Sequence, residues 1–171
     1  MLKHSQSVLI ITRTILILLS TFIRPKLEDG SWRTPYDPAR SIHTVGDFCE
    51  GNGWQYTFFA PQDPYGLIAL FGGDKPFATK LDGFFTNTDS MGEGASSDIT
   101  GLIGQYAHGN EPSHHVAYLY AYAGEQWKTA EKVRFIIVSF LHRPTRLASS
   151  VMRIVAKCLP GIFFHLWDSI R

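Results

Sequence analysis

The stretch Gly101–Gly124, GLIGQYAHGNEPSHHVAYLYAYAG, decides how the rest of the chain is interpreted. Its second half is aromatic and small apolar, and it predicts a helix that follows Pro112 and is closed by Gly124. Its first half collects side chains that can bind metals or hydroxyl groups: Gln105, His108, Asn110, Glu111, His114 and His115. A dense polar cluster therefore directly precedes a helix that is expected to pack in the interior.

The polar cluster suits calcium better than zinc. The side-chain oxygens of Gln105, Asn110 and Glu111 are hard ligands of the kind that calcium prefers. His114 and His115 are adjacent, so they cannot both face the core of one helix, and one of them is expected to point into a pocket. Adjacent histidines also lack the usual i,i+4 spacing of a zinc site. The alternative is a hydrogen-bonded loop in which Asn110 and Glu111 satisfy backbone groups.

Two helices are predicted from their starting residues. The stretch DPYGLIALFGG, 63–73, has Asp63 as a cap, proline in the first helical position, and a glycine pair that stops the helix. The stretch DKPFATKLDGFFT, 74–86, repeats the design, with Asp74 expected ahead of the helix. Its apolar residues recur at helical spacing and predict one buried face.

Two more helices complete the predicted framework. CEGNGWQYTFFAPQD, 49–63, predicts a short buried helix that ends before Pro61, and WKTAEKVRFIIVSFL, 127–141, predicts a longer helix with an apolar side from Val133 onward. No run of any length alternates with the period of a strand. The chain is therefore predicted to be all-α, with helices joined by long polar loops.

The length, composition and net charge of the chain limit its possible functions. The chain has 171 residues, enough for one domain with a core, and its 44% apolar and 18% charged residues are typical of a globular protein. A net charge of +1 gives no electrostatic basis for nucleic-acid binding, so no nucleic-acid partner is expected. Cys49 and Cys158 form neither a zinc spacing nor a disulfide framework.

The two ends differ in character from the middle. Ser7–Ile23, SVLIITRTILILLSTFI, is an apolar run with Arg13 near its centre. A central arginine costs about 2.5–3.5 kcal/mol on insertion scales, so this segment is a marginal membrane span or signal-peptide core. After residue 134 the chain is basic and apolar without a clear amphipathic stripe.

Glu50 is a candidate catalytic carboxylate. It lies in DFCEGNGWQY, next to Gly51, and a glycine allows a close backbone approach that can turn the carboxylate toward a cleft. The alternative is a carboxylate stabilised by the macrodipole at a helix N-terminus. Trp32, Trp54 and Trp127 lie near loop–helix junctions, where most tryptophans belong to the core and one or two could stack on a sugar.

Several phrases together resemble glycoside hydrolase family 92, the calcium-dependent exo-acting α-mannosidases. They are RPKLEDGSWRTPYDP, DFCEGNGWQYTFFAPQD, GLIALFGG, ASSDITGLIGQYAHGNEPSHHVAYLY and GEQWKTAEKVR, and they cover most of residues 24–134 in order. The resemblance implies an incomplete portion of an (α/α)₆ barrel, which in the family packs on an N-terminal β-sandwich domain absent from this chain. It also implies inverting hydrolysis of α-linked mannosides, such as the mannose of N-glycans, with bound Ca²⁺. Family members are usually exported, and the localisation of this chain stays open.

The resemblance also implies roles for individual residues. Glu50 corresponds to the general acid, which protonates the leaving oxygen. Gln105, Asn110 and Glu111 resemble residues of the calcium site or of the mannose site, with the calcium site preferred. His114 and His115 resemble residues that contact mannose, and Trp54 is expected to line the same pocket.

The chain departs from the family at both ends. The acidic segment of type GNEDCGQMSAWY, expected to supply the general base after the WKT helix, does not appear. Codons permitted for the tail can encode NEDCGQMSAWYIFSSMGFYP in a shifted frame, and those for the front can encode TFSKRANYNKNYFDPS. We therefore predict an out-of-frame segment at 1–23, a catalytic-domain fragment at 24–134 and an out-of-frame tail at 135–171.

Such a fragment is expected to be inactive and unstable by itself, because an unclosed barrel leaves apolar faces exposed. Two other functions stay open. The chain could be a residual module that binds calcium or carbohydrate, or a small membrane-anchored protein that uses Ser7–Ile23.

Overall fold

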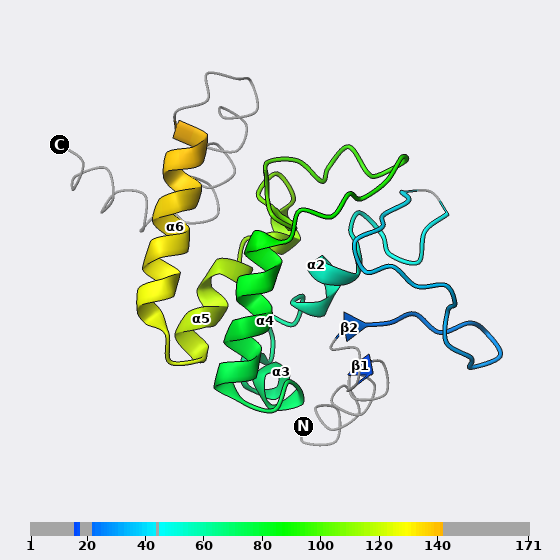
Figure 1. The fold of residues 1–171 in the computed structure, drawn as a ribbon, viewed down its shortest axis with the longest axis horizontal. Coiled ribbons are helices and arrows are strands. Elements are labelled where there is room, and N and C mark those ends of the chain that lie inside the picture. Colours follow the sequence, from blue (N-terminus) through cyan, green and yellow to red (C-terminus); the bar gives the residue numbers. More distant parts are fainter. Residues whose placement is uncertain (1–15, 18–21, 44, 142–171) are drawn as a thin grey trace.

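The computed structural model of the chain describes residues 16–17, 22–43 and 45–141. Most of their regular structure is helical (Figure 1). The α-helices are α2 Gly53–Thr57, α3 Pro64–Leu70, α4 Asp74–Thr86, α5 Leu119–Tyr122 and α6 Gln126–Leu141, and two 3₁₀ turns are η1 Glu111–Ser113 and η2 Val116–Tyr118. The strands are β1 Leu16–Ile17, β2 Phe22–Ile23, β3 Leu102–Ile103 and β4 Tyr106–Ala107.

The strands correct the prediction of an all-α chain. β1 pairs antiparallel with β2, and β3 pairs antiparallel with β4 in a hairpin closed by the two residues Gly104 and Gln105. Gly104 has φ 59°, and a Cβ on it would lie 2.5 Å from the backbone of Phe85. Glycine therefore permits both the tight turn and its close approach to α4.

The start of α3 confirms the predicted capping. The Asp63 side chain accepts a hydrogen bond from the backbone N–H of Gly66, and Pro64 occupies the first turn. At α4 the predicted cap is wrong by one residue, because Gly73 is the N-cap and Asp74 already lies in the first turn. Gly72 and Gly73 both have positive φ, so the chain reverses at the glycine pair and the helix begins immediately after it.

The helix predicted after Pro112 is replaced by two 3₁₀ turns and the four-residue α5. Within this segment His114 Nε2 lies 2.9 Å from the His108 carbonyl, and His115 Nε2 lies 2.8 Å from the Phe58 carbonyl. Short 3₁₀ turns of this kind are frequent next to α-helix ends. The predicted stop at Gly124 is confirmed by its φ of 75°.

An aromatic cluster fills the interior between α2, α4 and α5. Phe58 is fully buried, and its ring centroid lies 5.1 Å from that of Phe84 and 5.8 Å from that of Phe77. The predicted apolar face of α4 is confirmed, and its buried residues are Phe77, Ala78, Leu81, Phe84 and Phe85.

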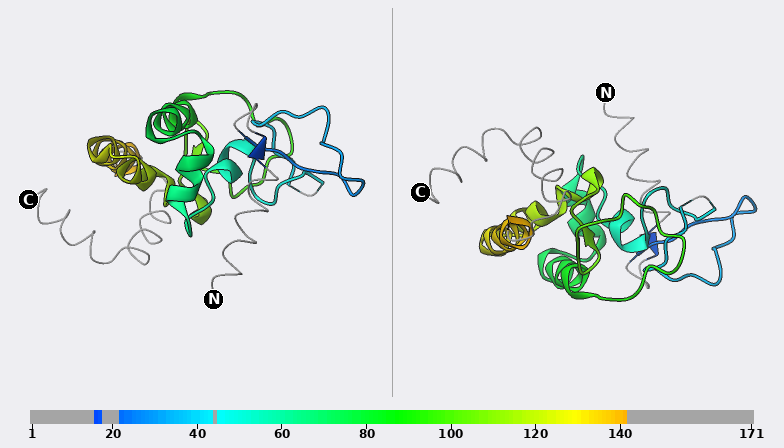
Figure 2. Two further views of the ribbon diagram at one scale, coloured as in Figure 1. Left: turned by 90° about the horizontal axis from the view of Figure 1, so that it is seen from below. Right: turned by 90° about the horizontal axis from the view of Figure 1, so that it is seen from above.

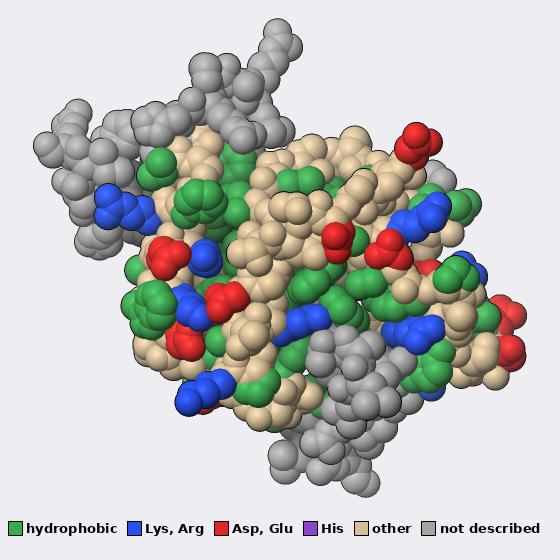
Figure 3. Space-filling view, viewed as in Figure 1, with side chains coloured by type: hydrophobic (Ala, Val, Ile, Leu, Met, Phe, Trp, Pro, Cys, Tyr) green, Lys and Arg blue, Asp and Glu red, His purple; other side chains and the backbone are tan. Residues whose placement is uncertain are grey.

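A polar network joins α4, α5 and α6 at the surface. The Asp82 carboxylate accepts hydrogen bonds from the Tyr120 hydroxyl and the Lys128 ammonium, both at 2.8 Å, and Lys128 also pairs with Glu125 at 2.7 Å. Figure 3 shows acidic and basic side chains interspersed over these helices. One carboxylate therefore fixes the spacing of three helices.

The helix α6 is apolar on two sides. Ile136 and Phe140 are buried against the core, whereas Trp127, Phe135 and Val138 are exposed. Figure 2 shows the helices gathered at one side of the molecule and the long loops at the other. The described helices do not close into a ring, so the structure supports a mostly helical fragment and the expected barrel is not seen within the described residues.

Both predicted end segments lie largely outside the described residues. Of Ser7–Ile23 the structure describes 16–17 and 22–23, which form β1 and β2. Among the described parts of the chain, no helix is both long enough and apolar enough to cross a bilayer. At the other end α6 continues through residue 134 to Leu141, and 142–171 are not described.

Replacing Phe58 with alanine is expected to lower the free energy of unfolding by about 3–5 kcal/mol, because a fully buried aromatic side chain leaves a cavity. The matched control is Phe59→Ala, since the adjacent Phe59 is 47% exposed. Urea denaturation followed by circular dichroism measures both. Equal losses for the two variants would contradict the assigned core.

Candidate functional site

The turn that carries Glu50 leads directly into α2. Glu50 is exposed and has φ 51°, a left-handed conformation that is uncommon for a residue with a Cβ. Two residues later Asn52 caps α2, and its side chain and that of Gln55 form a reciprocal capping box. The interpretation of Glu50 as a first-turn helix carboxylate is therefore incorrect, since Glu50 precedes the cap.

Asn110 links this turn to the polar cluster of Gly101–Gly124. Its side-chain Nδ2 donates a 2.8 Å hydrogen bond to the Glu50 carbonyl. The two residues are 60 positions apart in sequence. The structure thus joins the predicted acid to a residue predicted for the calcium site.

Gln105, also predicted for the calcium site, uses its side-chain amide inside the protein. The residue is 1% exposed, and its Oε1 accepts a 2.8 Å hydrogen bond from Asn52 Nδ2. Its Nε2 donates to Asn87 Oδ1 and to the Asp89 carbonyl, both at 2.9 Å. The amide therefore holds the α2 cap against the loop that follows α4.

Asn110 and Glu111 are the other two residues predicted for the calcium site. Glu111 is exposed, and Asn110 directs its nitrogen to Glu50, which leaves Oδ1 available. Calcium takes six to eight oxygen ligands, so this pair fits part of a coordination shell. Within the described residues, no group of three or more His, Cys, Asp or Glu side chains is arranged to hold a metal ion.

The predicted mannose contacts occupy different surroundings. The rings of His108 and His114 lie 5.0 Å apart, whereas His115 turns away to α2 and meets Phe59 edge-on at 5.9 Å. His114 therefore lies against His108, whereas His115 lies against the residues that follow α2.

Trp54 belongs to the core. It is 8% exposed, and its ring lies 4.7 Å from Phe22 and 6.4 Å from Phe84, measured between centroids. The Lys80 ammonium lies 4.4 Å from the same ring. Burial among these aromatic groups lowers the pKa of Lys80 to about 8.

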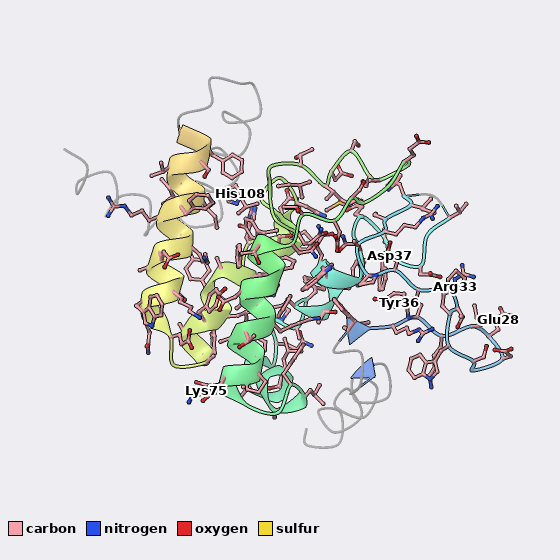
Figure 4. The ribbon with its side chains drawn as sticks, viewed as in Figure 1. Glu28, Arg33, Tyr36, Asp37, Lys75 and His108 are labelled. Atoms are coloured by element: carbon pink, nitrogen blue, oxygen red, sulfur yellow. The ribbon has the colours of Figure 1, made fainter. Side chains whose placement is uncertain are left out.

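Sequence reasoning missed a small hollow of about 80 Å³ beside the Glu50 turn. Its lining includes Tyr36, Arg40, Asp47, Phe48 and Gly51. Figure 4 shows Tyr36 and Asp37 on the loop side of the molecule, with His108 on the opposite side near α6. The phrase RTPYDPAR, which combines aromatic and charged residues, was the available signal.

His108 is buried between the hairpin and α6. The Tyr106 hydroxyl lies 2.7 Å from His108 Nδ1, and the His108 ring stacks on Phe140 at 4.9 Å. Burial, followed by the nearby His114, lowers the pKa of His108 to about 4. The ring is therefore neutral at physiological pH.

Comparison with known proteins identifies one family. Residues 6–146 match the glycosyl hydrolase family 92 catalytic domain. Over 128 residues the chain is 28% identical to an uncharacterized secreted glycosidase of Arthroderma benhamiae, covering 69% of this chain and 14% of that protein.

Solved structures that are similar to this chain belong to the same family. A family GH92 α-mannosidase of Bacteroides thetaiotaomicron, in complex with mannoimidazole, is 40% identical with a TM-score of 0.66 and covers 75% of this chain. A family GH92 inverting mannosidase of the same organism is 32% identical with a TM-score of 0.57 and covers 73% of this chain. In each case the alignment spans 18% of the solved chain, so this sequence represents less than a fifth of these relatives.

Lowering the pH from 7 to 4 is expected to reduce the free energy of unfolding. His108 takes up a proton near pH 6.5 when unfolded but near pH 4 when folded, so the unfolded chain binds more protons between these values and stability rises with pH. The His108 contribution is at most about 3 kcal/mol. Denaturation at several pH values should show that the free energy of unfolding depends less on pH in His108→Gln than in the native chain. Parallel profiles for His108→Gln and the native chain would refute this account.

Proposed function

Since the chain belongs to glycosyl hydrolase family 92, we propose that it is a fragment of an inverting α-mannosidase that acts on α-linked mannosides, including the mannose of N-glycans. The observation that supports this most directly is the hydrogen bond from Asn110 to the Glu50 carbonyl. It joins the candidate acid to the polar cluster that would receive the sugar.

Glu50 acts as the general acid in this proposal. Its carboxyl group transfers a proton to the glycosidic oxygen as the bond from that oxygen to the anomeric carbon breaks. In an inverting enzyme, water attacks the anomeric carbon from the opposite face, with a second carboxylate as base. The exposure of Glu50 supports this role, because the acid must reach a substrate oxygen.

The polar cluster binds the mannose and its calcium ion. Asn110 Oδ1 and the Glu111 carboxylate would supply oxygen ligands to the calcium ion, and the His114 ring would contact the sugar. A bound calcium ion would fix the orientation of the sugar hydroxyls. Gln105, also predicted for this site, supports it from the interior through its bond to the Asn52 cap. The direct roles of Gln105 and Trp54 at the ligand stay predictions.

Calorimetry with CaCl₂ and then methyl α-mannoside tests the proposed site. The native chain is expected to bind both, and Asn110→Ala to weaken calcium binding at least about tenfold through the lost oxygen. Glu50→Gln should keep calcium binding, as should Glu28→Gln, an exposed control on a remote loop.

The same samples distinguish the enzyme from the binding module. The isolated chain is expected to release no mannose from α-mannosides, since no residue of 24–134 is assigned as the base. Binding without turnover favours the residual module, and the absence of binding to either ligand would eliminate both. Calcium-dependent release of mannose at rates typical of enzymes would refute the proposed inactivity.

The match to the family covers 6–146, so it includes most of the segment 1–23 and the first residues of 135–171. We nevertheless propose that both end segments, 1–23 and 135–171, are translated out of frame. Sequencing the coding DNA across codons 19–24 and 134–151 is expected to reveal continuous family-like segments in the shifted frames. DNA that cannot encode those segments would make both ends genuine. The function of Ser7–Ile23 as a membrane anchor would then require testing by membrane fractionation.

A further inference from the structure

Glu50 holds a backbone conformation that its own side chain does not stabilise. Among the described residues it is the one non-glycine residue with a positive φ. Within the same part of the chain, no hydrogen bond or ion pair reaches its carboxylate. The direction of the carboxylate therefore depends on the backbone of the turn, which surrounding groups must hold in this unfavourable state.

Three consecutive carbonyl groups of the turn each accept one side-chain hydrogen bond. The Tyr56 hydroxyl donates to the Cys49 carbonyl at 2.6 Å, and the Ser41 hydroxyl donates to the Gly51 carbonyl at 2.7 Å. The bond from Asn110 to the Glu50 carbonyl lies between them. The donors come from α2, the N-terminal loop and the polar cluster, so the turn is held from three separate segments.

Tyr56 is itself held in place. It lies in α2, whose N-terminus is fixed by the capping box, and its ring packs on Phe48 with centroids 4.8 Å apart. A Cβ at Gly51 would lie 2.9 Å from the Tyr56 ring, so glycine allows the ring to approach the turn. Burial raises the pKa of Tyr56, which keeps its hydroxyl protonated as a donor.

Ser41 is equally constrained. It is 3% exposed, and its backbone N–H donates to the Met91 carbonyl at 3.0 Å. A donor fixed in this way stabilises one position of the Gly51 carbonyl, because a displaced carbonyl would leave a buried hydroxyl unpaired.

We infer that Tyr56 and Ser41 are positioning residues, which hold Glu50 in its left-handed conformation and so aim its carboxyl group at the leaving oxygen of a mannoside. This inference rests on the proposed function for its catalytic meaning. Neither residue needs to touch the substrate, since each acts through a carbonyl next to the acid.

The test is NMR spectroscopy of the full chain, with the Glu50 ¹³Cα and ¹³Cβ shifts and the HN–Hα coupling as reporters of φ. Tyr56→Phe and Ser41→Ala are expected to move these signals from values typical of the left-handed region toward averaged values. The ratio of molecules with Glu50 in the left-handed conformation to molecules with Glu50 outside it is expected to fall roughly tenfold. Ser41→Thr keeps the hydroxyl and should restore the native signals.

Matched controls exclude general effects. Tyr65→Phe and Ser31→Ala remove hydroxyl groups from exposed residues and should leave Glu50 unchanged. Tyr56→Phe retains the ring that packs on Phe48, so a folded variant with native Glu50 signals would overturn the role of Tyr56. Native Glu50 signals in Ser41→Ala would overturn that of Ser41.

This result is separable from the proposed function. Shifted Glu50 signals in Tyr56→Phe and Ser41→Ala would support the positioning contacts, whether or not the native chain binds calcium and methyl α-mannoside. Failure of the native chain to bind calcium and methyl α-mannoside would then remove the catalytic purpose of the contacts, and with it the inference that they aim an acid.

Discussion

The buried amide of Gln105 is the contact on which the rest of the structure depends. Its side chain bonds to Asn52, Asn87 and Asp89, and its backbone N–H donates to the Phe84 carbonyl at 2.9 Å. One residue thus ties together the cap of α2, the end of α4 and the hairpin. A buried amide is tolerated when all its polar groups are paired, so none of these segments can move alone without cost. The turn before α2 therefore has a fixed support.

The sequence predicts a helix well where capping residues and proline next to the helix end determine where it begins. Asp63 and Pro64 together define the start of α3, because both act within one turn of the helix. The hairpin of β3 and β4 was missed, since two-residue strands are too short to show alternation. A glycine in a two-residue loop was the usable signal, and Gly104 supplied it.

The structure places the residues of the candidate site, and their roles in binding and catalysis stay predictions. Glu50 and Asn110 were assigned to the same site by resemblance, and the structure connects them through a hydrogen bond. Residue type alone could not reveal that the amide of Gln105 is engaged internally, because its partner Asn52 lies 53 positions away. Nor could it reveal the support from Ser41 and Tyr56, which act on backbone carbonyls and leave no periodic pattern in the sequence.

The outward face of α6 affects how the protein can be handled. Trp127, Phe135 and Val138 are exposed on the side of α6 opposite the core, interspersed with the exposed charged residues Glu131 and Arg134. Large exposed apolar side chains promote self-association at the concentrations that calorimetry and NMR require. Light scattering should therefore accompany each titration, and a solubilising fusion partner is a sensible starting point for expression.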